Sequence, residues 1–466
     1  MRDSLLKRYH QLPPFLKSIA ASARGSYLRA WRYGPRTDEL CEAALAREHW
    51  TPREWQEWQE EKLARLLHRA VTHVPYYRDY WAKRRQLGDK ASPDILTNWP
   101  LLEKEALRKN PEAFVADDRS TSRMFHDHTS GTSGKSLDLW LARGTVQNWY
   151  ALFEARCRRW NGVSRHDRWA IIGGQLVAAV EQDAPPFWVW NAALHQLYLS
   201  AYHLAPRYIR SYADALRNYR IRYLLGYPSA IHAIARGILD QQIASPELKV
   251  VLTNAEPLLP RQRAEISEAF GCPVRETYGM AEIASAASEC EHGRMHLWPE
   301  AGVLETIPGT SDKASGEFLC TGLLNADMPL IRYRVGDRGE ISPANSPCEC
   351  GRTLPVLASI DGRTDDTLYT SDGRMIGRLD PVFKSRLPIY EAQIVQEALD
   401  RIRVRYIPVA GFTSADGLSL KERIRERMGP VNVVLDEVTE IPRTANGKFR
   451  AVICQLSAEE RKRIQT

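Results

Sequence analysis

Apolar positions at helical spacing mark the first strongly patterned stretch of the chain. They have the i, i+3, i+4 spacing of a buried helical face and comprise Leu63, Leu66, Leu67, Ala70, Val71 and Val74. Thr51 can cap this helix, Pro52 suits its first turn and Glu54 completes a capping box. We therefore predict a structural helix that begins after Thr51 and ends at Pro75.

Short apolar runs alternate with helical patterns between residues 120 and 345. The runs that we interpret as strands are Trp169–Ile172, Tyr223–Leu225, Val250–Leu252 and Glu317–Cys320. Ser211–Ile221 and Pro260–Phe270 have the spacing of intervening helices. Alternation of this kind predicts α/β layers around a largely parallel sheet.

The pattern restarts after Asp365 and predicts a second, smaller unit. The expected strands are Thr367–Tyr369, Arg403–Val409 and Val431–Leu435, and the expected helices are Pro388–Leu399 and Leu420–Met428. A chain of 466 residues is too long for one ordinary core. We expect a segment over residues 1–48, a large domain over 49–364 and a small domain over 365–466.

Composition adds limits on the class of protein. The charged and hydrophobic fractions, 26% and 44%, are ordinary for a soluble globular protein. No apolar run approaches the roughly 18 residues that span a bilayer, and the start of the chain lacks a secretory signal. Eight cysteines scattered through so long a chain indicate a reducing compartment. We therefore expect a cytoplasmic protein.

The positive charge is concentrated at the N-terminus. Residues 1–36 hold eight basic residues against Asp3 alone, which equals the formal net charge of +7 for the whole chain. Apolar residues such as Leu5, Leu6, Phe15 and Trp31 lie among them. This segment either docks as a helix on the large domain or makes a peripheral contact with an anionic membrane. The rest is nearly neutral, which argues against nucleic acid binding.

A loop rich in glycine and hydroxyl groups is the strongest candidate for binding phosphate. It comprises Thr129, Ser130, Gly131, Thr132, Ser133, Gly134 and Lys135. Glycines let the backbone approach an anion closely, while hydroxyls and amides donate to its oxygens. The spacing does not match the P-loop of nucleotide triphosphatases.

Further motifs follow this loop in a fixed order. They are Glu276-Thr-Tyr-Gly-Met-Ala-Glu282, Tyr333-Arg-Val-Gly-Asp337, Asp361-Gly-Arg-Thr-Asp-Asp366 and Pro442-Arg-Thr-Ala-Asn-Gly-Lys448. The ordered set resembles the adenylate-forming superfamily of acyl-CoA synthetases, adenylation domains and luciferases. Cys350-Gly-Arg-Thr-Leu-Pro355 and Val74-Pro-Tyr-Tyr77 are typical of its phenylacetate–CoA ligase-like and CapK-like branch. The resemblance covers roughly residues 50–455.

This resemblance implies a fold and a reaction. The fold is a large multi-layer α/β adenylating domain followed by a small, mobile α+β lid domain. The reaction is ATP-dependent adenylation of a carboxylic acid to acyl-AMP and pyrophosphate, followed by transfer of the acyl group. The acceptor is CoA, or an amine or hydroxyl in polysaccharide or secondary metabolism. Two alternatives stay open, which are transfer of AMP to a non-carboxylate substrate and a non-catalytic assembly partner.

Two departures from the family pattern bear on the acceptor. The phosphate loop continues as Gly134-Lys-Ser136, where many CoA ligases have Gly-Lys-Pro. The start of the lid, Tyr369-Thr-Ser-Asp-Gly373, lacks the motif common in aryl–CoA ligases. Both departures favour the CapK-like branch, so CoA is not required by the resemblance.

The same resemblance assigns roles in catalysis. Lys448, on the lid, is expected to stabilise the charge that develops between carboxylate and α-phosphate. Glu282 is expected to hold Mg²⁺ through a carboxylate oxygen. Asp365 matches the hinge about which the lid rotates between the two half-reactions.

It also assigns contacts with the nucleotide. Tyr278 is expected to stack on the adenine, Asp337 to accept hydrogen bonds from the ribose hydroxyls, and Arg363 to hold the ribose or a phosphate. The other positions expected to contribute are Ala255, Glu256, Glu276, Thr277 and Gly279.

Two further sites are expected in the large domain. The pocket for the acid is predicted to have an aromatic or apolar wall that includes Gly173, Gly174, Tyr227 and Pro228, with Trp149, Tyr150 and Ile231 nearby. A structural zinc site is predicted at Cys290, His292, Cys348 and Cys350, since three thiolates and one imidazole suit tetrahedral zinc. His296 is the alternative imidazole ligand.

Overall fold

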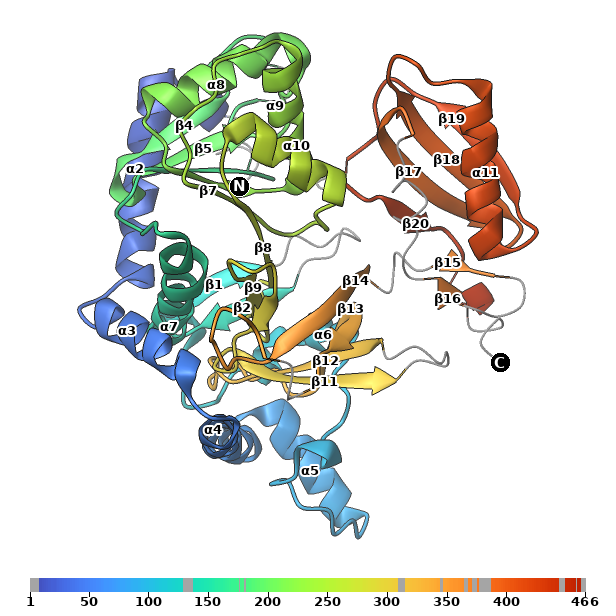
Figure 1. The fold of residues 1–466 in the computed structure, drawn as a ribbon. Helices are drawn as coiled ribbons and strands as arrows, with labels where there is room; N and C mark the ends of the chain where they lie inside the picture. The colour runs from blue at the N-terminus through green and yellow to red at the C-terminus, as the bar shows by residue number, and fades with distance from the viewer. Residues whose placement is uncertain are drawn as a thin grey trace.

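A large body and a smaller C-terminal unit beside its upper half make up the computed structural model (Figure 1). The structure describes residues 8–128, 137–175, 177–179, 182–308, 315–343, 347–363, 368–370, 375–376, 387–443, 449–457 and 459–461. Within these ranges, no helix has the length and apolar character that crossing a bilayer requires. All eight cysteines are free thiols.

The N-terminal segment packs on the large body. Helix α2 (Pro14–Arg32) contacts strand β4 (Trp188–Asn191), and helix α3 (Thr37–Ala46) contacts helix α7 (Arg143–Phe153). The approach of α2 is close, because a Cβ at Gly25 would lie 2.0 Å from the Asn191 Oδ1 atom. Docking of this segment as a helix is therefore confirmed.

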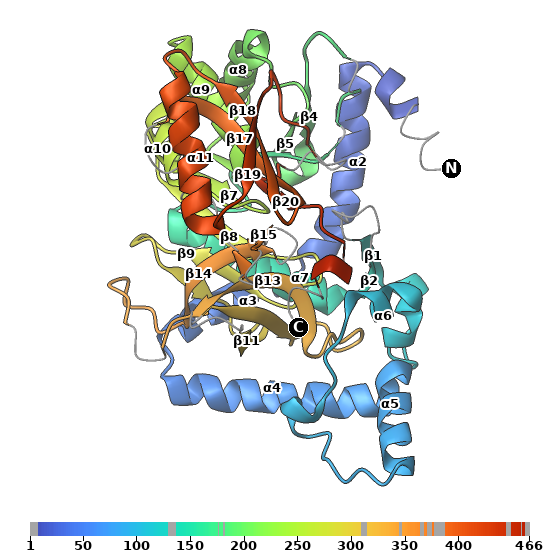
Figure 2. The same ribbon diagram turned by 90° about the vertical axis from the view of Figure 1, so that its right-hand side faces the viewer.

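The predicted amphipathic helix is α4 (Pro52–His73), which runs along the foot of the molecule (Figure 2). The Thr51 hydroxyl accepts from the Glu54 N–H at 3.3 Å, and the Glu54 carboxylate accepts from the Thr51 N–H at 2.7 Å. The capping box is thus confirmed. Helix α5 (Pro75–Gln86) begins where the predicted stripe ends, and α6 (Lys104–Lys109) follows.

A twelve-stranded sheet forms the centre of the large body, in the order β11-β12-β13-β14-β10-β9-β8-β7-β6-β3-β5-β4. Its remaining strands are β3 (Trp169–Gly173), β5 (Gln196–Ser200), β6 (Tyr223–Gly226), β7 (Val250–Thr253), β8 (Val274–Gly279), β9 (Ala286–Glu289), β10 (Met295–Leu297), β11 (Gly302–Pro308), β12 (Gly316–Gly322), β13 (Tyr333–Ile341) and β14 (Val356–Arg363). The strands predicted from apolar runs are all present.

The expectation of a largely parallel sheet is wrong for this sheet as a whole. Within this sheet, as far as the structure describes it, parallel pairing is confined to β5–β3, β3–β6, β6–β7 and β7–β8. Helices α8 (Ile209–Asn218), α9 (Pro228–Asp240) and α10 (Pro260–Phe270) lie between successive parallel strands in the chain. No α-helix lies between β8 and β14 in the described residues, and the pairings there are antiparallel.

Strands β1 (Phe125–His128) and β2 (Asp138–Leu141) form a separate antiparallel pair. They flank the predicted phosphate loop, whose residues Thr129 to Lys135 lie outside the described residues.

The C-terminal unit is a four-stranded sheet in the order β19-β18-β17-β20, with a helix, α11 (Ser414–Met428). The strands are β17 (Ile389–Ala398), β18 (Arg401–Pro408), β19 (Asn432–Glu437) and β20 (Val452–Cys454), and a small pair, β15 (Leu368–Tyr369) and β16 (Met375–Ile376), precedes them. Leu420, Ile424 and Met428 of α11 are buried in the same core as Ile402 and Val404 of β18. A large N-terminal domain with a smaller C-terminal α/β domain, the expected lid, is thus confirmed.

The predicted helix at Pro388–Leu399 is wrong, because this segment is strand β17. Its Ala, Glu, Gln and Leu residues favour a helix, but it is hydrogen-bonded between β18 and β20. Ile394 and Val395 are buried in this central position. Pairing with two neighbours has overridden local propensity.

Candidate active site

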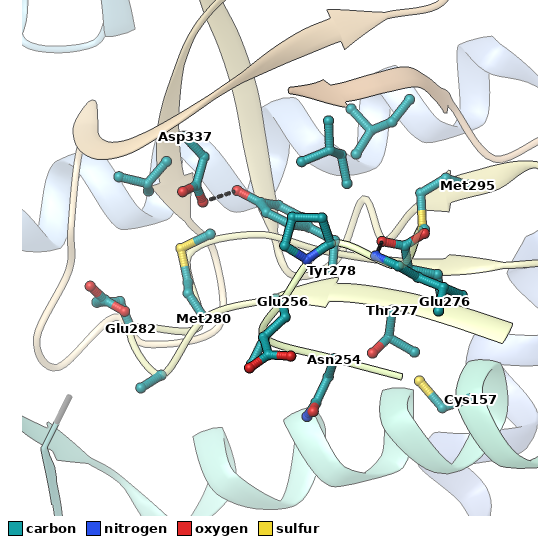
Figure 3. Close-up of a pocket in the computed structure, with 18 of the residues that line it drawn as sticks. Cys157, Asn254, Glu256, Glu276, Thr277, Tyr278, Met280, Glu282, Met295 and Asp337 are labelled. Atoms are coloured by element: carbon teal, nitrogen blue, oxygen red, sulfur yellow. Dashed lines mark hydrogen bonds between the residues drawn. The ribbon is translucent and has the colours of Figure 1, made fainter. Parts of the chain in front are cut away.

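A cavity of about 1830 Å³ lies between the large domain and the lid. The large domain contributes Asn254 to Leu258 after β7, Thr277 to Glu282 from β8 onward, and Asp337 of β13. The lid contributes Phe449 and Arg450. Residues from several motifs distant in sequence therefore line one space, and Figure 3 shows part of it. The part lined by Asn254 and Thr277 lies at the carboxyl ends of parallel strands, where α/β sheets commonly bind ligands.

Tyr278 and Asp337 are joined by a hydrogen bond in this cavity. The Tyr278 hydroxyl donates to the Asp337 carboxylate at 2.9 Å (Figure 3). Burial, followed by the negative charge of Asp337, raises the pKa of Tyr278 well above its ordinary value. Asp337 lies opposite Arg363 in the β13–β14 register, although the Arg363 side chain is outside the described residues. The positions expected to contact adenine and ribose are therefore neighbours.

Glu282 is held by a buried tyrosine. The Tyr333 hydroxyl donates to Glu282 Oε1 at 2.9 Å, and Tyr333 is fully buried at the start of β13. A carboxylate oriented in this way is a suitable hard oxygen ligand for Mg²⁺. No role was expected for Tyr333 from the sequence, although this residue opens the motif that ends at Asp337.

Glu256 connects the large domain to the lid. Its carboxylate accepts hydrogen bonds from the backbone N–H of Ser229, at 3.1 Å, and of Phe449, at 2.7 Å. Burial raises the pKa of Glu256. Glu256 lines the cavity as expected, but its carboxylate lies at the boundary with the lid. Lys448, which directly precedes Phe449 in the sequence, and the hinge residue Asp365 lie outside the described residues.

The other predicted nucleotide positions also line the cavity. Glu276 forms an ion pair with Arg263 at 3.7 Å, and the Thr277 hydroxyl donates to the Thr253 carbonyl at 2.9 Å. Ala255 has a left-handed backbone (φ 66°), which costs free energy in a residue other than glycine. A Cβ at Gly279 would lie 3.6 Å from the Trp149 ring, so this glycine faces the aromatic wall.

The predicted acid pocket agrees only in part with this cavity. Trp149 and Tyr150 line it, but the four positions Gly173, Gly174, Tyr227 and Pro228 do not. These four lie around the start of α9, and Ile231 is buried in the core beside them. The wall instead extends along α7 and the face of β3, β5 and β6, which the chain pattern did not identify as a cavity.

Three cysteines and one histidine form a cluster from residues that follow β9, belong to β10 or precede β14. The ligand atoms of Cys290, His296, Cys348 and Cys350 are all within 4.8 Å of one another. His292 is not in this group, since its imidazole faces Glu349 at 3.3 Å. The structure therefore favours His296, the alternative, because β10 directs it toward the cysteines.

The geometry of this cluster fits zinc. Tetrahedral zinc with Zn–S bonds of about 2.3 Å separates two thiolates by about 3.8 Å. The Cys290 and Cys348 sulfurs are 3.7 Å apart, and Cys350 Sγ is 3.4 Å from His296 Nε2. His296 Nδ1 is 3.1 Å from the Leu354 carbonyl, which assigns the proton to Nδ1 and leaves Nε2 as a ligand.

Comparison with known proteins gives matches over most of the chain. The model of the CapK C-terminal domain matches residues 368–455. Protein CapK from Staphylococcus aureus is 26% identical over 406 residues, which cover 85% of this chain and 88% of that protein. Phenylacetate-coenzyme A ligase from Escherichia coli (strain K12) is 26% identical over 80% of this chain and 83% of the ligase.

The fold is similar to that of a solved CoA ligase. 2-Hydroxyisobutyryl-CoA ligase in the postadenylation state, in complex with 2-HIB-AMP, has a TM-score of 0.64 at 21% identity. The match covers 90% of this chain and 93% of that one. For the same ligase in the thioesterification state the TM-score is 0.52.

Proposed function

Because the chain belongs to the adenylate-forming superfamily, in its CapK and phenylacetate–CoA ligase-like branch, we propose that it activates a carboxylic acid with ATP. The first step gives an acyl-AMP and pyrophosphate. The second passes the acyl group to CoA, or to an amine or hydroxyl acceptor. The related phenylacetate–CoA ligases support CoA-ligase-like chemistry.

The observation that carries this proposal is the contact between Glu256 and the lid. The Phe449 N–H donates to the Glu256 carboxylate at the cavity that also contains Tyr278, Glu282 and Asp337. Lys448 lies outside the described residues but directly precedes Phe449 in the sequence, so the motif with the expected catalytic lysine adjoins a residue that contacts the nucleotide side.

The first step needs an in-line attack on the α-phosphorus. A carboxylate oxygen of the acid forms the new O–P bond, while the bond from the α-phosphorus to the bridging oxygen breaks and pyrophosphate leaves. Lys448 stabilises the charge that develops between the two reactants. Asp337 orients the ribose and Tyr278 the adenine. Glu282 would hold Mg²⁺, which neutralises phosphate charge when bound.

The second step releases AMP. A nucleophile on the acceptor attacks the acyl carbon, and the bond to the AMP oxygen breaks. We propose that the lid rotates about Asp365 between the two steps, as its position between the domains suggests. The departures at Ser136 and at residues 369–373 support an acceptor that is not obligatorily CoA.

A screen for pyrophosphate release tests this function. Aryl, fatty and amino acids are incubated with ATP, Mg²⁺ and hydroxylamine, which traps an acyl-AMP as the hydroxamate, with and without CoA. We expect release that depends on one class of acid and does not require CoA. A stable AMP conjugate without free AMP would indicate AMP transfer, and no reaction with any acid would indicate a non-catalytic protein.

Replacement of the lid lysine separates its role from nucleotide binding. Lys448→Ala should lower acid-dependent pyrophosphate release by about 100-fold or more, because a charge stabilised only in the transition state is lost. The Kd for ATP should stay near the wild-type value. The control is Lys421→Ala on α11, which removes another lid lysine and should preserve the rate. Equal losses in binding and rate would contradict the assignment.

The outer face of α2 supports a further contact, with an anionic membrane surface in the cytoplasm. Phe15 and Ile19 are 64% and 60% exposed and lie one turn apart. Arg24 and Arg29 are exposed on the same helix. Helix α2 can therefore pack on the large domain with one face and present apolar and basic groups with another.

A further inference from the structure

The cavity continues from the nucleotide side into the large domain, along one face of the sheet. Strand register places Ile171 of β3 beside Tyr198 of β5 and Leu225 of β6. Two residues earlier, Trp169 lies beside Gln196 of β5. All five side chains line the cavity. Since alternate residues of a strand share a face, these rows form a continuous wall.

The opposite wall comes from α7 and the turns that follow it. Trp149, Tyr150, Phe153 and Arg158 line the cavity from this side. Trp149 is next to Gly279, at the nucleotide end, whereas the Arg158 guanidinium lies 5.3 Å from the Trp169 ring centre. The cavity therefore has a mouth near the nucleotide and a deep end near Trp169.

The deep end is far from the site of adenylation. Trp169 precedes Gly173, the last residue of β3, by four residues, which is about 13 Å along a strand. The nucleotide-lining residues Asn254 and Thr277 lie at the carboxyl ends of the neighbouring strands. An acid whose carboxylate is at the mouth must be extended to reach this end.

The deep end is polar although the walls above it are aromatic and apolar. Gln196 is 2% exposed, and its Oε1 has no hydrogen-bond partner among the described residues. Arg158 is equally buried; it donates to the Tyr223 hydroxyl at 2.7 Å and to Glu154 at 3.0 Å. An unpartnered buried acceptor is unfavourable, so a ligand with a donor at this depth gains affinity.

The charged residues at the deep end of the cavity determine which chemical group of a ligand can lie beside Gln196. Arg158 already forms an ion pair with Glu154, so its guanidinium at the deep end is not free to pair with a second carboxylate. An ammonium group would meet the positive guanidinium. A hydroxyl is neutral and can donate to Gln196 Oε1 while it accepts from a neighbouring N–H. An aliphatic tail would leave the buried amide without a partner.

We propose, on the premise of the function proposed above, that the activated acid is an extended aromatic carboxylic acid with a hydroxyl at its distal end. Its rings lie between Trp149, Tyr150 and Phe153 on one side and Ile171, Tyr198 and Leu225 on the other. Its hydroxyl donates to Gln196. An acid with a phenyl ring but no hydroxyl would contact both walls and leave Gln196 Oε1 without a hydrogen-bond donor.

Matched pairs of acids test the proposal with the wild-type protein. 4-Hydroxycinnamate is compared with cinnamate, and 4′-hydroxybiphenyl-4-carboxylate with biphenyl-4-carboxylate. We expect kcat/KM for pyrophosphate release, in at least one pair, to favour the hydroxylated acid by about 10- to 100-fold. A preference for the unsubstituted acids, or for fatty acids, would overturn it.

A variant assigns the selectivity to Gln196. Gln196→Met, which conserves volume and removes the amide, should bring the ratio between hydroxylated and unsubstituted acid close to one. Gln86→Met makes the same change at an exposed position at the end of α5 and should keep the wild-type ratio. An unchanged ratio in folded Gln196→Met would refute the proposal. If that variant does not fold, the substrate pairs alone decide.

Calorimetric measurement of the binding of the same acids tests the pocket assignment separately from the adenylation activity on which the proposal rests. Selective binding of hydroxylated acids without pyrophosphate release would contradict adenylation and support the pocket assignment. Pyrophosphate release with aliphatic acids alone would support adenylation and contradict the pocket assignment.

Discussion

Two tyrosine hydroxyls donate hydrogen bonds to Glu282 and Asp337, the two carboxylates that have proposed roles in the reaction. Tyr333 donates to Glu282 and Tyr278 donates to Asp337, each at 2.9 Å. Such bonds orient a carboxylate before a ligand arrives, which reduces the reorganisation needed in the transition state. The two tyrosine hydroxyls thus contribute to the geometry of the site by orienting these carboxylates.

Tyr333→Phe should reveal this contribution. It removes the hydrogen bond to Glu282 and keeps the buried ring, so the carboxylate that we propose to hold Mg²⁺ loses its orientation. A hydrogen bond to a charged group is worth about 1.5–3 kcal/mol, which corresponds to a fall in kcat of about 10- to 100-fold. Tyr406→Phe, which removes a hydroxyl 3.5 Å from Glu437 in the lid, is the control and should keep the rate. Wild-type kcat in Tyr333→Phe would exclude the orienting role.

If the cysteine–histidine cluster binds zinc, the purified protein should contain a measurable amount of this metal. Elemental analysis should find about one zinc per chain, and Cys348→Ser should remove it. Because the site joins two loops, this variant should lose thermal stability by more than it loses rate at a permissive temperature. Cys272→Ser alters another buried cysteine outside the cluster and should retain the metal. Metal-free protein with an unchanged Tm would reject the site.

Sequence spacing alone could not identify which histidine joins the three cysteines. The Cys-x-His pair of Cys290 and His292 is the natural reading of the sequence. In the structure β10 pairs with β9 in a hairpin that carries His296 back to the cysteines. The motifs around Glu282 and Asp337 were predictable because residue type and order suffice for them. The imidazole ligand depends on strand register, which has no local signal.

Contacts between elements determine where the lid rests. The Arg261 guanidinium of α10 donates to the Ile389 carbonyl of β17 at 2.8 Å, and His232 of α9 stacks on Tyr390 with ring centres 6.1 Å apart. With the bond from Phe449 to Glu256, these contacts dock the lid on α9 and α10. The docked orientation is the one that we associate with adenylation.

Glu256→Ala should therefore affect one half-reaction more than the other. Loss of the bond to Phe449 should slow pyrophosphate release by about tenfold, since a charge-assisted hydrogen bond is lost. Acyl transfer from supplied acyl-AMP should be spared, because we propose that this step uses another lid orientation. Glu268→Ala, at an exposed position on α10, is the matched control. An equal loss in both half-reactions would indicate a general structural defect.

The elements of the large domain were more predictable than those of the lid. Capping at Thr51, the buried strands and α10 have strong local signals. Strand β17 does not, because its residues favour a helix and only pairing with β18 and β20 makes it a strand. The cavity along β3, β5 and β6 was also missed, since a face lined with Trp169, Ile171 and Leu225 has the pattern of an ordinary core.

At the scale of the whole molecule, the described part of the N-terminal segment, from residue 8 onward, packs on the large body. Glu48, which follows α3, is buried and ion-pairs with Arg352 at 3.1 Å and Arg156 at 3.5 Å. The Trp160 indole N–H donates to the same carboxylate at 2.8 Å. The region after α3 is thus anchored close to the cysteine–histidine cluster, whereas the basic helix α2 contacts β4 and α7 and leaves its outer face exposed.

Vesicle binding tests that outer face. Full-length protein should bind anionic vesicles at low salt and dissociate as salt rises, since each cation near the surface contributes about 1 kcal/mol. The double variant Phe15→Ala, Ile19→Ala should weaken binding without a change in soluble adenylation. Leu87→Ala with Ile95→Ala, also exposed apolar positions, is the control. Absence of binding at low salt would show that α2 serves only to pack on the fold.

The most direct test of carboxylate adenylation is the fate of the carboxylate oxygens. An acid that supports pyrophosphate release is labelled with ¹⁸O in its carboxyl group and carried through acyl transfer, and the AMP is analysed by mass spectrometry. If the acid attacks the α-phosphorus, the AMP that leaves must contain one ¹⁸O atom. AMP without label, or AMP retained on a non-carboxylate product, would contradict the proposed function.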